Sequence, residues 1–95
     1  MIRVEPISDD EWLVTVEAKT VTKHRVRVTP ADLHRYGDFD VSAEKLLEAS
    51  FRFLLDRESN TSILSSFHLP VINRYFPEYE TTIRTMFSNT SPGTT

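Results

Sequence analysis

One stretch of the chain, residues 42–80, constrains the fold more than any other. It reads SAEKLLEASFRFLLDRESNTSILSSFHLPVINRYFPEYE and combines the clearest helical pattern in the sequence with two prolines that interrupt its second half. It also holds six of the ten aromatic side chains, namely Phe51, Phe53, Phe67, Tyr75, Phe76 and Tyr79. Because large aromatic side chains dominate the energetics of protein cores, we expect the core to be built around this stretch.

The stretch opens with the predicted main helix, residues 43–57. Ser42 supplies the hydroxyl that commonly caps a helix N-terminus. Leu47, Phe51 and Leu54 recur at helical spacing, and further apolar residues widen the stripe that they form. This apolar stripe is wider than the area that packing against one face of a sheet would bury. We therefore expect this helix to be covered on a second side by the C-terminal half of the chain.

The rest of the C-terminal half is predicted as short helical segments that prolines separate. Residues 63–67 are expected to form a helical turn, and Pro70 restarts helix over residues 71–76. The residue before a proline is disfavoured in a helix, so a last helix is expected over residues 77–87. The polar residues 88–95 are predicted to be a disordered tail.

The first third of the chain reads as three β-strands, residues 1–7, 12–18 and 21–28. In each of them apolar and polar side chains alternate, and polar turn residues lie between them. Strands joined by such short turns pair in antiparallel fashion. We therefore predict a three-stranded antiparallel β-meander with one apolar face.

The register of the meander follows from the rule that directly opposed residues share a face. Pairing Val16 with His24 keeps the apolar residues of the second and third strands together. A reversal of the chain near Asp9 places Val4 opposite Val14. Both pairings imply loops with an odd number of residues.

A short helix over residues 30–36 connects the meander to the main helix. Thr29 supplies a cap, Pro30 suits the first helical position, and Gly37 suits the stop. The predicted fold class is α+β. It consists of a three-stranded antiparallel β-meander packed on one face by the main helix and the C-terminal short helices, in a single domain of residues 1–87.

Length and composition limit the classes of protein to which this chain can belong. Ninety-five residues form one domain with a modest core, and the absence of cysteine excludes disulfides and thiolate sites. No apolar run approaches the length of a membrane span, and the opening MIRVEPISDD lacks the apolar run of a signal peptide. We therefore expect a cytoplasmic, monomeric protein that does not bind membranes.

Catalytic and metal-binding motifs are not evident in the sequence. His24, His34 and His68 do not have the spacing of metal ligands, no GxSxG motif marks a nucleophile, and two glycines are too few for a phosphate-binding loop. His24 falls on the inward face of a strand, where a hydrogen-bonded core histidine is the expected role. We predict no catalytic residue, no cofactor and no metal, and we do not expect an enzyme.

A row of basic residues is the main electrostatic feature. These cations share the outward face of the predicted sheet and could lie along a phosphate backbone: Arg3, Lys23, Arg25 and Arg27. Glu5 and Glu17 fall on the same face and are expected to neutralise the row in part. Because the net charge of the chain is −3, we favour a solvated face over a nucleic-acid site.

Three segments in the second half resemble a family of small uncharacterised bacterial proteins. They read SFRFLLDRES at residues 50–59, NTSILSSFHLPVI at residues 60–72 and RYFPEYE at residues 74–80. The strand-then-helix layout and the strand at residues 24–28 also fit this family. The resemblance implies a bacterial, stand-alone domain and implies no chemistry.

Taken together, these patterns favour a non-catalytic accessory or protein-interaction module. An alternative is a nucleic-acid-binding or regulatory protein that uses the basic strand of Lys23, Arg25 and Arg27. An exposed apolar patch would favour the first interpretation, and a continuous positive stripe would favour the second.

Overall fold

The structure, a computed structural model, describes residues 1–37 and 41–88. Residues 38–40 and nearly all of the predicted tail, residues 89–95, therefore lie outside the described part of the chain. The strands are β1 (Ile2–Pro6), β2 (Glu11–Glu17), β3 (Val21–Arg27) and β4 (Ser66–His68). The helices are α1 (Pro30–Tyr36), α2 (Ala43–Leu55), the 3₁₀ helix η1 (Asn60–Ser62), α3 (Val71–Tyr75) and α4 (Tyr79–Ser88).

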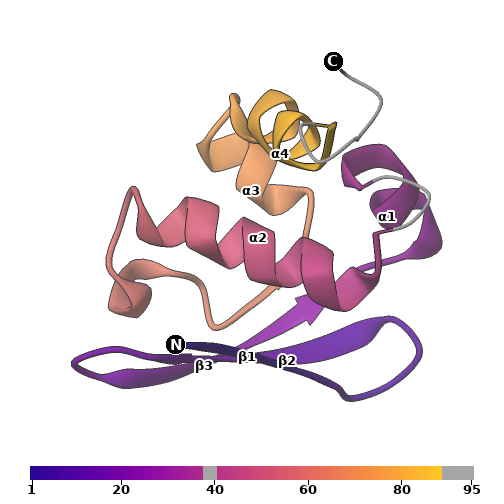
Figure 1. The fold of residues 1–95 in the computed structure, drawn as a ribbon. Coiled ribbons are helices and arrows are strands. Elements are labelled where there is room, and N and C mark those ends of the chain that lie inside the picture. The colour runs from indigo at the N-terminus through magenta and orange to yellow at the C-terminus, as the bar shows by residue number, and fades with distance from the viewer. Residues whose placement is uncertain (38–40, 89–95) are drawn as a thin grey trace.

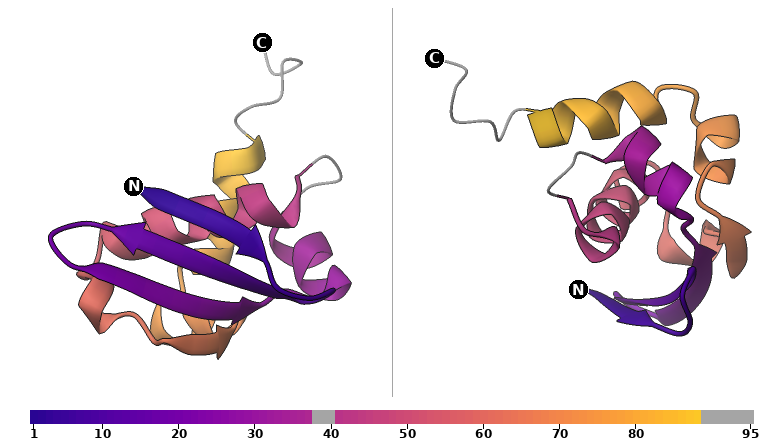
Figure 2. Two further views of the ribbon diagram at one scale, coloured as in Figure 1. Left: turned by 90° about the horizontal axis from the view of Figure 1, so that it is seen from below. Right: turned by 90° about the vertical axis from the view of Figure 1, so that its right-hand side faces the viewer.

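The elements form three layers, with the sheet at one side, α2 in the middle and α3 and α4 beyond it (Figure 1). The helices all lie on one face of the sheet, and α1 lies near one end of α2 (Figure 2). The α+β class is confirmed. So is the expected second cover over α2, because the Phe53 and Tyr79 rings pack edge to face at 5.3 Å.

The sheet has four strands in the order β1-β2-β3-β4, so the predicted three-stranded antiparallel meander is wrong in this detail. β4 pairs with β3 in parallel, and the connection between them runs through α1 and α2. A parallel pair needs a long crossover of this kind. The helical turn predicted at residues 63–67 is also wrong, because η1 ends at Ser62 and the chain then extends into β4.

The register of β1 and β2 is as predicted, with Val4 opposite Val14. That of β2 and β3 is shifted by two residues, because His24 lies opposite Val14 and not opposite Val16. A shift of two leaves every side chain on its predicted face, so alternation alone cannot detect it. Odd-numbered loops are confirmed, since three residues separate the last pair, Glu17 and Val21.

Local helix signals are accurate to within two residues. α1 has the predicted bounds, and its capping box joins the Asp32 N–H to Thr29 Oγ1 at 3.2 Å and the Thr29 N–H to Asp32 Oδ2 at 2.9 Å. The Ser42 cap accepts from the Lys45 N–H at 3.2 Å. Later helix ends differ from the prediction, because α2 ends at Leu55 and α4 begins at Tyr79.

The core lies between the sheet and α2 and continues beyond α2 to α4. Leu47 and Phe51, from the centre of the predicted stripe, are fully buried together with Val14, Val26 and Tyr79. None of the helices in residues 1–37 and 41–88 is long and apolar enough to cross a membrane.

Candidate functional site

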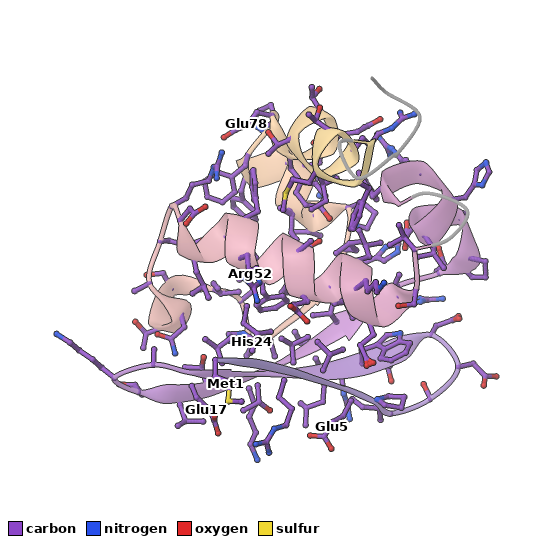
Figure 3. All side chains as sticks on the ribbon, viewed as in Figure 1. Met1, Glu5, Glu17, His24, Arg52 and Glu78 are labelled. Atoms are coloured by element: carbon purple, nitrogen blue, oxygen red, sulfur yellow. The ribbon has the colours of Figure 1, made fainter. Side chains whose placement is uncertain are left out.

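The basic residues predicted as a polyanion surface share the outer face of the sheet. They are exposed, and the strand pairings place them on the face opposite α2: Arg3, Lys23, Arg25 and Arg27. Figure 3 shows Glu5 and Glu17 on this same side of the sheet, whereas His24 lies between the sheet and α2. The helices therefore leave this face uncovered.

The acidic residues on this face neutralise only one of the four cations directly. Arg3 Nη2 lies 4.0 Å from Glu17 Oε2. Within the described ranges no acidic side chain comes within ion-pair distance of Lys23, Arg25 or Arg27. The β3 row thus offers three cations to an external anionic group.

His24 is a buried, hydrogen-bonded histidine, as predicted. It is 2 % exposed, and its Nδ1 lies 2.8 Å from the Leu64 carbonyl oxygen. Since a carbonyl only accepts, Nδ1 donates there, and Nε2 accepts from Thr22 Oγ1 at 2.8 Å. Asn60 Nδ2 donates to the same Thr22 oxygen at 2.9 Å and to the Thr20 carbonyl at 2.7 Å. This network fastens the segment before β4 to β3.

The outer edge of β4 carries free backbone groups. Arg25 N–H donates to the Ser65 carbonyl at 2.8 Å, and Leu69 N–H donates to the Arg27 carbonyl at 3.0 Å. Alternation along a parallel ladder then directs the N–H and C=O groups of Ser66 and His68 away from β3. Nothing in residues 1–37 and 41–88 makes a backbone hydrogen bond to them.

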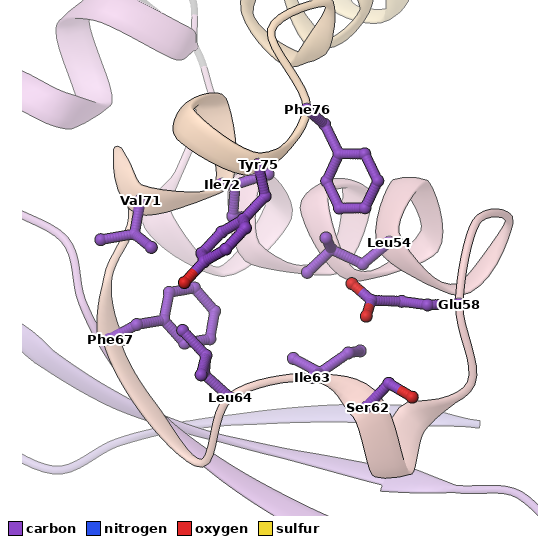
Figure 4. A pocket seen from close by; sticks show the side chains of 10 residues that line it. All are labelled: Leu54, Glu58, Ser62, Ile63, Leu64, Phe67, Val71, Ile72, Tyr75 and Phe76. Carbon is purple, nitrogen blue, oxygen red and sulfur yellow. The ribbon is translucent and has the colours of Figure 1, made fainter.

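An apolar cleft lies beside β4, between the end of α2, η1 and α3 (Figure 4). Its volume is about 190 Å³, and Leu54, Ile63 and Phe67 are among the side chains that border it. Leu64 and Tyr75, also at its border, remain 45 % and 66 % exposed. Exposed apolar groups gathered at one cleft are typical of binding sites.

The sequence interpretation missed this cleft because it assigned a helical turn to residues 63–67. The alternation Ser66, Phe67, His68, Leu69 was the available signal, since it matches the two-residue period of a strand. The structure confirms that alternation: Leu69 is fully buried, Phe67 is half-buried, and the two polar residues are exposed.

The titratable groups of the described residues do not assemble into a metal site, because no three His, Asp or Glu side chains gather closely enough to hold an ion. Burial raises the pKa of Tyr79 far above its usual range, so this hydroxyl stays neutral and serves as a donor. It lies 2.6 Å from Ser50 Oγ, whose own hydrogen is directed to the Leu46 carbonyl. The absence of catalysis and of cofactors stays a prediction.

Comparisons of the chain with protein-family models, with curated proteins and with solved structures found no significant match. The resemblance to a small bacterial family therefore also stays a prediction.

Proposed function

We propose that this chain is a protein-interaction module that binds an extended segment of another protein along β4. The observation that carries the proposal is the coincidence of an open strand edge with an apolar cleft. The outward N–H and C=O groups of Ser66 and His68 are matched by a partner that offers backbone donors and acceptors at the same spacing, which is a β-strand.

The side chains of such a segment would alternate between two environments. Those on the helix side of the sheet would lie beside Phe67 and enter the cleft, where apolar side chains are favoured. Those on the outer side would lie beside Ser66 and His68, in line with the unpaired cations Arg25 and Arg27. The partner segment is therefore expected to alternate apolar and acidic residues.

A synthetic peptide tests this proposal. The probe is a fluorescein-labelled peptide of about seven residues that alternates leucine with glutamate, the length of an ordinary strand. We expect saturable binding by fluorescence anisotropy, and Tyr75→Ser and Leu64→Ser should each weaken it by about tenfold, the usual effect at an interface anchor. Val21→Ser, which also truncates an exposed apolar side chain but lies away from the cleft, should leave affinity unchanged.

A second peptide distinguishes binding as an added β-strand from binding through apolar side chains alone. Methylation of alternate backbone nitrogens blocks hydrogen bonding on one edge of the peptide and leaves its side chains in place. This peptide should bind at least about tenfold more weakly, as expected where main-chain hydrogen bonds supply the affinity. Equal binding of the two peptides, or concentration-dependent dimers of the protein that compete with the peptide, would contradict the proposal.

The unpaired β3 cations support nucleic-acid binding as a second candidate function. If Lys23, Arg25 and Arg27 contact phosphates, each neutralised charge should reduce the salt slope of binding by about one. We expect no salt-sensitive retention of the protein on single-stranded or duplex DNA, because the chain is acidic overall. Micromolar binding at physiological salt that is lost when all three are changed to glutamate would establish the second candidate instead.

A further inference from the structure

Glu58 places a negative charge at the apolar cleft. Of the described residues that border the cleft, Glu58 alone is charged, and the others are apolar or carry a hydroxyl. Its side chain is half-buried, and Figure 4 shows the carboxylate directed into the cleft, toward Leu54 and Ile63. Leu54 and Ile63 are both buried, so apolar side chains replace part of the water around this charge. An ion pair formed in such surroundings is stronger than one in open water, because the local dielectric constant is lower.

The Glu58 carboxylate is accessible and has no partner in the fold. Within residues 1–37 and 41–88 it makes neither an ion pair nor a hydrogen bond. Its oxygens still reach the surface, since the one fully buried side-chain polar atom of these residues that lacks a hydrogen bond is Tyr36 Oη. A ligand that enters the cleft can therefore contact the Glu58 oxygens without any rearrangement of the core.

Arg57, the cation next to Glu58 in the sequence, is engaged elsewhere. Its Nε lies 3.1 Å from Glu78 Oε2, and its Nη1 donates to the Phe53 carbonyl at 3.2 Å. Its Cζ lies 3.6 Å from the centroid of the Phe53 ring. These contacts direct Arg57 toward the start of α4, and Arg57 does not border the cleft. The chain therefore leaves the charge of Glu58 to be neutralised from outside.

The size of the cleft and the position of Glu58 limit what can neutralise it. The volume of about 190 Å³ is below the roughly 300–1,000 Å³ of pockets that enclose whole drug-sized ligands, so the cleft fits a single side chain. Figure 4 shows Phe67 of β4 and Glu58 at opposite ends of the cleft. A side chain that enters beside β4 must therefore cross apolar surface before it reaches the carboxylate. Lysine combines a long apolar stem with a cationic end group.

We propose that the cleft binds a lysine side chain of the segment that pairs with β4, an inference that rests on the proposed strand addition. The methylene stem lies against Leu54 and Ile63, and the ammonium group pairs with Glu58. The ring of Tyr75, at the same cleft, offers the cation a further attraction through its π face. Lysine fits better than arginine, whose five donors would exceed the acceptors that one carboxylate supplies. The partner segment thus carries lysine at one of its otherwise apolar positions.

Substituted forms of the leucine–glutamate peptide test this inference with the full chain. One leucine at a time is replaced by lysine or by norleucine, which has the four-carbon stem of lysine without the ammonium group. At one position the wild type should bind the lysine peptide about tenfold more tightly than the norleucine peptide, as measured by fluorescence anisotropy. Glu58→Gln should abolish this preference and leave the affinity for the norleucine peptide unchanged. Asp56→Asn removes a carboxylate at an exposed position outside the cleft and should keep the preference.

Glu58→Lys gives a second variant, in which the reversed charge should make the lysine peptide the weaker of the two ligands. The inference is overturned if the wild type binds the lysine and norleucine peptides equally at every position, or if the preference for lysine persists in Glu58→Gln and Glu58→Lys. In both cases saturable binding of the all-leucine peptide would still support strand addition at β4. If strand addition itself is wrong, the all-leucine peptide does not bind either, so the two failures are distinguishable.

Discussion

The two sides of α2 that face the C-terminal half differ in how completely they are closed. Toward α4, Phe53 and Ser50 meet the fully buried Tyr79 through a ring contact at 5.3 Å and a hydrogen bond of 2.6 Å. Toward β4 and α3, Leu54 borders a cleft whose edge residues Leu64 and Tyr75 stay exposed. Both sides are apolar, yet only the first is filled by the chain itself.

This difference separates residues that hold the fold from residues that are available to a partner. Apolar surface that is removed from water stabilises the folded state at about 25 cal/mol per Å². The Leu64 and Tyr75 side chains keep much of their surface in water, so much of their hydrophobic free energy is not used in folding. It remains available for binding.

Phe51→Ala should have the largest effect on stability. Phe51 is fully buried, with the His24 ring centroid at 5.3 Å and the Phe67 ring centroid at 6.1 Å. Truncation of a core phenylalanine costs about 3–5 kcal/mol, which urea unfolding would measure. The neighbouring Arg52→Ala removes only an exposed ion pair and should cost less than about 1 kcal/mol. A mild effect of Phe51→Ala would mean that α2 is not the centre of the core.

Asn60→Ala should have the next largest effect, because the buried Asn60 side chain hydrogen-bonds η1 to Thr20 and to Thr22 of β3. The change removes two donors and leaves the Thr20 carbonyl and Thr22 Oγ1 short of a partner. We expect a loss of about 1–3 kcal/mol in the free energy of unfolding. Thr61→Ala, at the next and exposed position, is the control. Equal stability of both variants would show that η1 does not anchor the segment before β4.

Tyr79→Phe makes a smaller change, on the side of α2 that packs against α4. It keeps the aromatic packing and deletes the hydroxyl that donates to Ser50, whose remaining bond to the Leu46 carbonyl is retained. The expected cost is about 1 kcal/mol by thermal or urea unfolding. Tyr75→Phe makes the same change beside the apolar cleft and should leave the free energy of unfolding unchanged, because Tyr75 is 66 % exposed. Equal losses of stability in Tyr79→Phe and Tyr75→Phe would contradict the difference between the α4 side and the cleft side of α2.

Tyr75→Ser and Leu64→Ser should have the smallest effects on stability, within about 0.5 kcal/mol, as is usual for exposed positions. Their large effect is expected on peptide affinity instead. A loss of stability of several kcal/mol in either variant would show that the cleft belongs to the core, and the proposed binding site would then be withdrawn.

Local signals in the sequence were sufficient for most elements and for the burial of α2. Capping residues and prolines act on their own backbone, so Thr29, Ser42 and Pro30 identified helix starts correctly. Alternation identified which face of β2 and β3 is buried, since each side chain is confined to one face of a strand. The width of the apolar stripe on α2 also predicted the second cover that α4 provides.

Tertiary structure alone decided β4, the register of β3 and the apolar cleft. The alternation from Ser66 to Leu69 permits a short strand, but it does not identify the parallel partner, which lies some forty positions away in the sequence, as in the pair Arg25 and Ser66. Asn60 and Leu64 bond to Thr22 and His24 across a similar distance and fasten the segment before β4 to β3. Likewise, the meeting of Asp32 with His68 depends on where two strands end in space. Contacts between distant segments leave no periodic trace in the sequence, because each contributes single residues and no repeating pattern.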